Sequence, residues 1–204
     1  VPHEHTVALG VGANGGESAI DGPTFLSTIG WDWLPAVRDR DTGIFLPVTM
    51  DSSGPVIVKD PFVTAELSPG YDSADLHIAA TLENKSGKPV SGVVKGTVQL
   101  LNSQDRAITF EKPITIAASR PEMLRLDSNS VPQLHVSAPK LWWPNGYGPQ
   151  NLYTLTLSFE EGKNTSSSET RQFGIRKIEY QVADSENLTL VVNGVRIMAR
   201  GGNW

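Results

Sequence analysis

The chain contains no cysteine, and its 204 residues include no long apolar run, no basic cluster and almost no helical periodicity. Without cysteine, disulfides, zinc–thiolate sites and thiol nucleophiles are all excluded. No stretch approaches the roughly 20 apolar residues of a membrane helix, so no membrane span is expected. A net charge of −5 without a basic run is unsuited to nucleic acid, whose phosphates require clustered lysine and arginine. No nucleic-acid partner is therefore expected.

Alternating apolar and polar residues are what the sequence does contain, within the composition of a globular protein. The alternation runs through residues 75–82, 94–100 and 153–159, and it predicts antiparallel strands with one buried and one wetter face. Glycine, proline and small polar residues predict loops at residues 83–89 and 161–168. The expected fold class is all-β.

Three parts of the chain differ in character. Residues 56–177 supply roughly the ~100 residues and seven strands of an immunoglobulin-like β-sandwich. Residues 1–52 are glycine-rich, with only brief apolar runs, and are too few to bury a core of their own. We expect them to be the last strands of a larger β-domain. Residues 178–204 are expected to contain a strand, a short acidic loop and a hairpin.

The hairpin prediction rests on the Asn-Gly dipeptide at residues 193–194, because both central positions of a type I′ turn need a positive φ. The hairpin leads to a last residue, Trp204, that is bulky and apolar, whereas chain termini are normally polar and exposed. The first residue, Val1, is not an initiator methionine and begins no signal-peptide pattern. We therefore expect the chain to be a piece of a longer protein.

Residues 141–155 read LWWPNGYGPQNLYTL and carry the most specific spacing of the interior. Pro144 fixes φ, two glycines permit a tight turn, and the run then enters a strand. Adjacent Trp142 and Trp143 could stack on the apolar face of a sugar ring. The other interpretation is that they close the end of the sandwich core, because buried aromatic area dominates core energetics.

Three motifs together resemble the middle section of glycoside hydrolase family 2. They are residues 141–155, the tetrapeptide FGIR at 173–176 and NGVRIMARGGNW at 193–204, in the family's order and spacing. Upstream, GWDWLP at 30–35 and DTGIF at 41–45 resemble the closing strands of the family's jelly-roll domain. These two elements are more similar to the β-mannosidase and exo-β-glucosaminidase branch than to the β-galactosidases.

The resemblance implies a domain order, because chains of this family run from a jelly roll through an immunoglobulin-like sandwich to a (β/α)₈ barrel. Residues 1–52 would be the C-terminal part of the sugar-binding jelly roll, and 56–177 the whole sandwich. Residues 178–204 would be the linker hairpin and the start of the catalytic barrel. The sandwich is then expected to pack against that barrel within one molecule.

The resemblance also implies a chemistry. Family members retain anomeric configuration with two barrel glutamates about 5 Å apart, one the acid/base and the other the nucleophile. The acid/base follows an asparagine in the family, yet this chain contains no Asn-Glu dipeptide. We therefore expect both catalytic carboxylates beyond Trp204, no catalytic residue in this chain, and no activity of the chain alone. The parent enzyme would release terminal β-linked mannose, glucosamine or galactose, and no cofactor is expected.

Four residues are expected to bind the sugar if the resemblance holds. Trp31 and Asp32 match a jelly-roll pair that supplies a stacking face and a hydroxyl acceptor in the subsite of the terminal sugar. The alternative is that Asp32 caps a turn between packed tryptophans. Asn203 and Trp204 would lie at the end of the first barrel strand, where such barrels build their sites.

Other patterns are interpreted as structural, and no metal site is expected. The segment His3-Glu4-His5 is interpreted as ordinary surface, and residues 39–43 as a turn rather than a calcium loop. A competing hypothesis is a complete carbohydrate-binding sandwich without enzymatic activity, which predicts a polar C-terminus and sugar affinity in isolation. The compartment is left open by the sequence; export to the periplasm or the exterior would suit an enzyme that degrades glycans.

Overall fold

The structure is a computed structural model. It describes residues 9–11, 17–19, 47–118, 120–182 and 188–200. The chain divides into two compact units, Val1–Asp51 and Ser52–Trp204. In the first unit, β1 (Leu9–Val11) and β2 (Glu17–Ala19) form a two-stranded antiparallel sheet. The assignment of this unit to a jelly roll stays a prediction.

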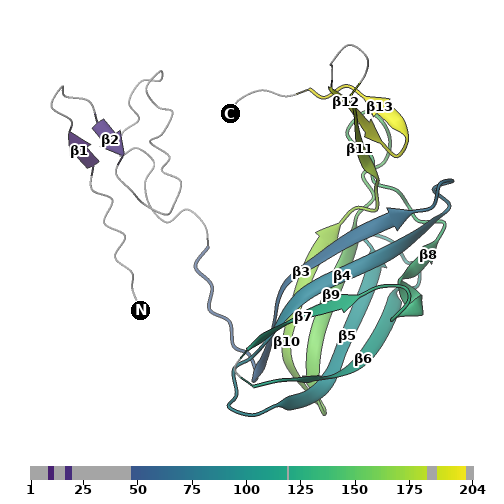
Figure 1. Ribbon diagram of the computed structural model, residues 1–204. Coiled ribbons are helices and arrows are strands. Elements are labelled where there is room, and N and C mark those ends of the chain that lie inside the picture. Colours follow the sequence, from purple (N-terminus) through teal and green to yellow (C-terminus); the bar gives the residue numbers. More distant parts are fainter. Residues whose placement is uncertain (1–8, 12–16, 20–46, 119, 183–187, 201–204) are drawn as a thin grey trace. The chain divides into compact units, whose positions relative to one another are not determined.

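The second unit contains two four-stranded antiparallel sheets, drawn as two layers in Figure 1. One sheet has the order β3-β4-β7, and β8 also pairs with β4. Its strands are β3 (Val56–Leu67), β4 (Ser73–Asn84), β7 (Pro121–Leu126) and β8 (His135–Ser137). The other sheet has the order β10-β9-β5-β6. Its strands are β5 (Val90–Leu100), β6 (Ile108–Ile116), β9 (Tyr153–Glu161) and β10 (Asn164–Phe173).

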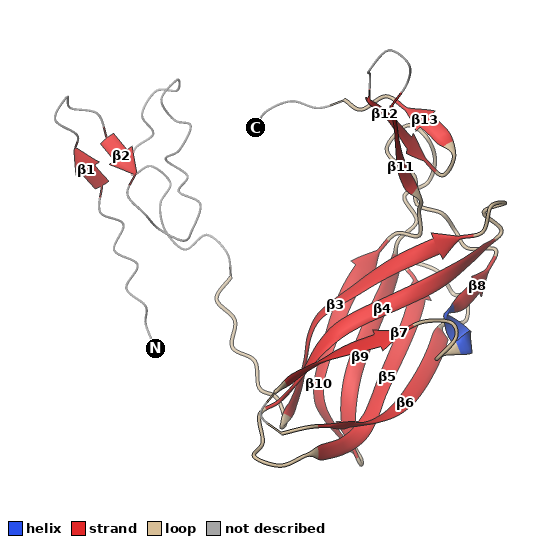
Figure 2. Ribbon diagram, in the orientation of Figure 1, coloured by secondary structure: helices blue, strands red, loops and turns tan. Residues whose placement is uncertain are grey.

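This arrangement confirms the prediction of an all-β, immunoglobulin-like sandwich. The described residues are in strands and loops apart from one short 3-10 helix, η2 (Pro132–Leu134), which Figure 2 shows in blue. No helix among the described residues has the length and apolar character needed to cross a membrane.

The core lies between the two sheets and follows from the alternation in the sequence. On β9, every second residue from Tyr153 to Phe159 is buried, and β4 alternates in the same way. The fully buried side chains include Phe159, Leu76, Ile78, Leu82, Ile116, Leu126, Leu134, Leu155 and Leu157. Burial of each such side chain is worth about 1.5 to 3 kcal/mol. The three strands predicted from alternation are confirmed.

Gly96 on β5 makes room for one of the core aromatics. It lies directly opposite Phe110 of β6, and a Cβ at Gly96 would overlap the Phe110 ring. Phe110 is 3% exposed, so its ring lies over the glycine and inside the core. The alternation at residues 94–100 predicts the strand but not this contact.

The loop predicted at residues 161–168 is wrong over most of its length. A two-residue turn at Gly162, whose φ is 63°, leads directly into β10 at Asn164. The polar residues of this segment fit an edge strand because most of their side chains face solvent. The loop predicted at residues 83–89 is present, but it begins only after Asn84, which is the last residue of β4.

Beyond the sandwich, three strands form a further antiparallel sheet. They are β11 (Ile178–Val182), β12 (Leu188–Val192) and β13 (Val195–Ile197). The turn between β12 and β13 has φ of 47° at Asn193 and 78° at Gly194. Two positive values are what the type I′ prediction requires, so the hairpin is confirmed. Its assignment to the start of a barrel stays a prediction.

Candidate functional site

The four predicted sugar-binding residues, Trp31, Asp32, Asn203 and Trp204, lie outside the described residues. Their roles stay predictions. Within the part of the chain that the structure describes, no group of three or more histidine, aspartate or glutamate side chains could hold a metal ion. The described residues closest to Asn203 in the sequence are 198–200, which follow the β12–β13 hairpin. This hairpin contacts the loop between β8 and β9.

We call residues 141–151 of that loop the Trp142 loop. Its backbone is closed on itself, because Trp143 N donates to Pro149 O at 3.1 Å and Tyr147 N donates to Pro144 O at 3.1 Å. It is also attached to the segment that follows β10, since Trp142 N donates to Ile175 O at 2.9 Å. The turn chemistry expected from the proline and glycines is therefore present and gives the loop a defined shape.

Both tryptophans of the loop are half-buried and lie at the margin of the core. The guanidinium carbon of Arg176 lies 4.7 Å from the centre of the Trp142 ring, which is a cation–π contact. A Cβ at Gly174 would come within 2.7 Å of Trp142, and one at Gly148 within 2.7 Å of Trp143. These contacts support the interpretation that the tryptophans pack at the end of the sandwich core. Neither ring closes the core completely, because both side chains are half-buried.

Asn193 joins the hairpin to the sandwich. Its Nδ2 donates to Trp142 O at 3.0 Å, and its Oδ1 accepts from Lys177 N at 2.9 Å. Its own backbone N–H donates to Lys177 O at 2.9 Å. The residue is only 5% exposed, and its left-handed backbone is one that asparagine adopts more readily than most residues. One side chain therefore links three segments of the chain.

Two tyrosines of the sandwich contact the same hairpin. A Cβ at Gly194 would lie 2.9 Å from the hydroxyl of Tyr71, so only glycine fits there without a shift. The Tyr147 hydroxyl accepts a hydrogen bond from Met198 N at 3.0 Å. The sequence predicted the turn but not these partners, because Tyr147 and Met198 are 51 residues apart and no local pattern connects them.

Two ionisable groups near the contact between the hairpin and the Trp142 loop have shifted pKa values. The ion pair with Glu179, at 3.0 Å, raises the pKa of Lys177 above its ordinary value. Burial raises the pKa of Tyr153, whose hydroxyl accepts a hydrogen bond from Lys140 N at 2.8 Å. Both shifts move the group away from neutral pH, where a general acid or base would work best. Neither shift favours proton transfer by these two groups, and the hydrogen bonds of Asn193 link the segments here.

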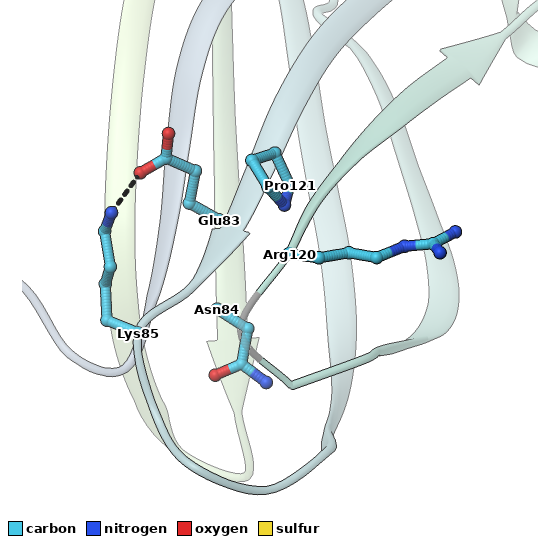
Figure 3. Close-up of a pocket in the computed structure, with 5 residues that line it drawn as sticks. All are labelled: Glu83, Asn84, Lys85, Arg120 and Pro121. Atoms are coloured by element: carbon cyan, nitrogen blue, oxygen red, sulfur yellow. Dashed lines mark ion pairs between the residues drawn. The ribbon is translucent and has the colours of Figure 1, made fainter.

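A polar hollow at the opposite end of β4 is also structural. Figure 3 shows Glu83 facing Lys85, while Arg120 points away from both. Glu83 Oε2 lies 2.6 Å from the Lys85 ammonium and 3.0 Å from that of Lys59, and these two partners lower the pKa of Glu83. Buried Asn84 donates to the carbonyl oxygens of Lys88 and Ile116, at 2.8 and 3.1 Å. These groups hold the loop after β4 in place.

Comparison with known proteins shows which family the chain belongs to. The profile of glycosyl hydrolases family 2 matches residues 56–176, which is more than half of the chain. The chain belongs to this family. The matched residues of this family 2 chain begin with the first residue of β3 and end at Arg176, the residue that lies over Trp142. The resemblance inferred from the sequence motifs is thus confirmed.

Curated relatives of this family 2 chain are much longer than it is. An exo-β-D-glucosaminidase of Streptomyces avermitilis is 32% identical over 179 residues, which are 87% of this chain and 19% of the relative. A mannosylglycoprotein endo-β-mannosidase of Lilium longiflorum is 33% identical over 179 residues, 86% of this chain and 18% of the relative. The chain therefore spans about a fifth of the length of these relatives.

Solved structures agree on the fold. The crystal structure of an exo-chitosanase of Amycolatopsis orientalis has a TM-score of 0.62 at 24% identity, covering 74% of this chain and 16% of that one. A family 2 member of Bacteroides cellulosilyticus has a TM-score of 0.60 at 20% identity, covering 74% of this chain and 19% of the other. At these identities the likeness establishes the sandwich architecture.

Proposed function

We propose that this chain is a non-catalytic part of a retaining exo-β-glycosidase. The whole enzyme would hydrolyse terminal β-linked glucosamine or mannose by double displacement, with galactose a less favoured substrate. Residues 1–52 would complete a sugar-binding jelly roll, residues 56–177 would brace the barrel, and residues 178–204 would lead into it. Both catalytic glutamates would then come from residues that follow Trp204.

The observation that carries this proposal is the similarity across 179 residues to a protein named as an exo-β-D-glucosaminidase and to one named as an endo-β-mannosidase. The exo mode of the proposal follows the first of these names. The similarity exceeds 30% identity for both, and it extends over more of the chain than the sandwich alone. The preference for these two sugars follows the GWDW and DTGIF elements together with the relatives' names. The chain itself contains no Asn-Glu dipeptide, which supports a catalytic acid/base elsewhere.

Within this proposal, Trp31 and Asp32 would shape the subsite of the terminal sugar. An indole face suits the apolar face of a pyranose, and a carboxylate that accepts from a hydroxyl makes a strong orienting contact. Asn203 and Trp204 would contribute from the first barrel strand. An Asp32→Ala change in the whole enzyme is expected to reduce kcat/KM, while an exposed Asp105→Ala change leaves it near the wild-type value.

Nitrophenyl β-glycosides of glucosamine, mannose and galactose provide the main test. The chain alone should release no nitrophenol, whereas the chain extended along its gene should hydrolyse the glucosaminide or the mannoside. Proton NMR of the first product should show the β-anomer, as double displacement requires. Turnover by the chain alone, if abolished by an internal Glu→Gln change, would refute the placement of catalysis beyond Trp204.

Titration calorimetry distinguishes the competing hypothesis of a complete carbohydrate-binding module. On the enzyme proposal, the chain alone has at most part of a sugar site and should give no measurable heat with glucosamine, mannose or galactose. Saturable binding by the chain alone, together with no activity of the extended protein, would favour the binding module.

A further inference from the structure

A hollow lies at the end of the sandwich where β8 of one sheet faces β5, β6 and β9 of the other. Its volume is about 310 Å³, at the lower end of the range for small-molecule sites. The floor is aliphatic, because Val98 is buried there and Leu100, Ile108 and Val136 are half-buried. The exposed rim includes the polar residues Asp105, Arg106, His135 and Lys140. The hollow therefore suits a small ligand with an apolar body and a polar head.

The hydroxyl of Tyr153, which also lines the hollow, has hydrogen-bonding capacity to spare. The residue is only 6% exposed, and its oxygen accepts from Lys140 N at 2.8 Å. A phenol can also donate its own hydrogen. Among the hydrogen bonds of the described residues, none takes this hydrogen. An acceptor oxygen on a ligand would complete the bonding of the hydroxyl.

The charges around the hollow favour an anion. Arg106 and Lys140 are both cationic, and neither forms an ion pair with a carboxylate in the described part of the chain. Asp105 is the single carboxylate of the lining. His135 is already engaged, because its Nδ1 lies 3.0 Å from Asp75 Oδ1. Two cations beside a phenolic donor are the kind of groups that bind carboxylate oxygens.

Both walls of the hollow are held in place. Gln99 Nε2 donates to Asp105 O at 2.8 Å, and Asp105 N donates to Ser103 Oγ at 3.0 Å. On the other wall, Ala138 N donates to Asp72 O at 2.7 Å, and Ala138 has a φ of 48° that alanine rarely adopts. Backbone strain of this kind is concentrated at functional sites. A site whose walls are already fixed also loses less entropy on binding.

We propose that this hollow binds a small monocarboxylate with a short aliphatic chain. The carboxylate accepts from the Tyr153 hydroxyl and pairs with Arg106 and Lys140, while the aliphatic chain lies over Val98 and Val136. Each methylene group that the floor covers adds to the affinity. Binding here does not depend on the proposed glycosidase function, so each can fail without the other.

Hexanoate is the probe for the first test, added to the isotope-labelled chain and followed by proton–nitrogen correlation spectra. Amide shifts should saturate around residues 98–108 and 135–140, with a Kd of about 1 mM, as expected for so small a ligand. Hexanol lacks the carboxylate and acetate lacks the chain, so each should bind at least about tenfold more weakly. No saturable shifts at these residues with hexanoate, or equal affinity for hexanol, would overturn the proposal.

Two substitutions test the assigned contacts. Tyr153→Phe removes the hydroxyl, and Arg106→Gln removes a charge at an exposed position where the fold should not be disturbed. Each should raise the Kd for hexanoate about three- to tenfold. The matched control is Lys163→Gln, in the turn at the opposite end of β9, which should keep the wild-type affinity. Unchanged affinity in both pocket variants, or an equal loss in the control, would overturn the proposal.

Competition experiments identify other occupants. Neither mannose nor inorganic phosphate should displace hexanoate at matched concentration, because mannose has no carboxylate and phosphate has no aliphatic part to bury. Displacement by mannose would make the hollow a sugar site. Displacement by phosphate would make it an anion site without an apolar requirement. Either result would overturn the assignment to a monocarboxylate.

Discussion

Ser166 on β10 binds both backbone groups of Val56, the first residue of β3. Its hydroxyl accepts from Val56 N at 2.9 Å and donates to Val56 O at 2.7 Å. The two residues are 110 positions apart and belong to different sheets, and Ser166 is 5% exposed. A single buried hydroxyl therefore joins the edges of the two layers at the point where the sandwich begins.

Replacing Ser166 by alanine should lower the free energy of unfolding by about 1 to 3 kcal/mol, because a buried N–H and a buried carbonyl lose their partner. Urea denaturation followed by tryptophan fluorescence measures the change. Ser168→Ala, at an exposed position of the same strand, should stay within about 0.5 kcal/mol of the wild type. Equal effects of the two substitutions would contradict the role assigned to the buried hydroxyl.

Replacing Gly96 by alanine should destabilise the sandwich by about 1 to 3 kcal/mol or more, since the added methyl group overlaps the Phe110 ring and forces the core to shift. The matched control is Gly87→Ala, where a Cβ would meet nothing within 4 Å. Thermal unfolding of the two variants should differ clearly. If Gly96→Ala is as stable as Gly87→Ala, the packing described for Phe110 is wrong.

Replacing Asn193 by alanine should cost about 2 to 4 kcal/mol, from the two lost side-chain hydrogen bonds and from strain at the positive φ. Asn193→Gly removes the same hydrogen bonds but tolerates the backbone, so its cost should be about 1 kcal/mol smaller. Near-ultraviolet circular dichroism of the tryptophans, combined with urea titration, follows both. An equal loss of stability in the two variants would show that strain at the positive φ does not contribute.

The lowered pKa of Asp75 predicts that the stability of the fold depends on pH. Its hydrogen bond with His135, 3.0 Å long, is the main cause that lowers the pKa of Asp75, and a bond with Ser128 adds to it. A lowered carboxyl pKa stabilises the fold above the unfolded value, near about 3.9, and the gain disappears as pH falls through the folded pKa.

The stability advantage of the wild type over Asp75→Asn should therefore be present near about pH 5 to 6 and vanish toward about pH 2. It should be small, because the His135 and Asp75 side chains are 49% and 41% exposed. Urea titrations across this range test it, with the exposed Asp105→Asn as control. A difference that persists at the lowest pH would point to a cause other than charge.

The parts of the fold that could be predicted from the sequence are those encoded by near neighbours. The alternation from Tyr153 to Phe159 identified a buried strand because the period of a strand is visible within a few residues. The Asn-Gly pair identified the hairpin because few other residues accept two positive φ values. The family motifs extended this to the sandwich as a whole.

The missed features depend on contacts between distant residues. The serine-rich start of β10 has the composition of a loop, and the burial of Ser166 in this strand is possible because Val56 satisfies its hydroxyl. The hydrogen bonds between Tyr147 and Met198 and between Asn193 and Trp142 each join residues 51 positions apart, so the sequence pattern could not predict them.

The bulge in β3 is different: Asp60 has a φ of 49° and the register shifts between Lys59 and Phe62. The dipeptide Asp60-Pro61 is a local signal of such a bulge, because proline inside a strand is confined to edges and bulges, and this signal was missed.

The bonds of Asn193 also bear on where this protein can be divided. The family match stops at Arg176, but Lys177 N and Trp142 O bind the Asn193 side chain, which lies well beyond that limit. A product ending at Arg176 would leave the Trp142 carbonyl without the Asn193 carboxamide. A sandwich prepared by truncation or limited proteolysis should therefore retain the chain at least through the β12–β13 hairpin to keep its native end.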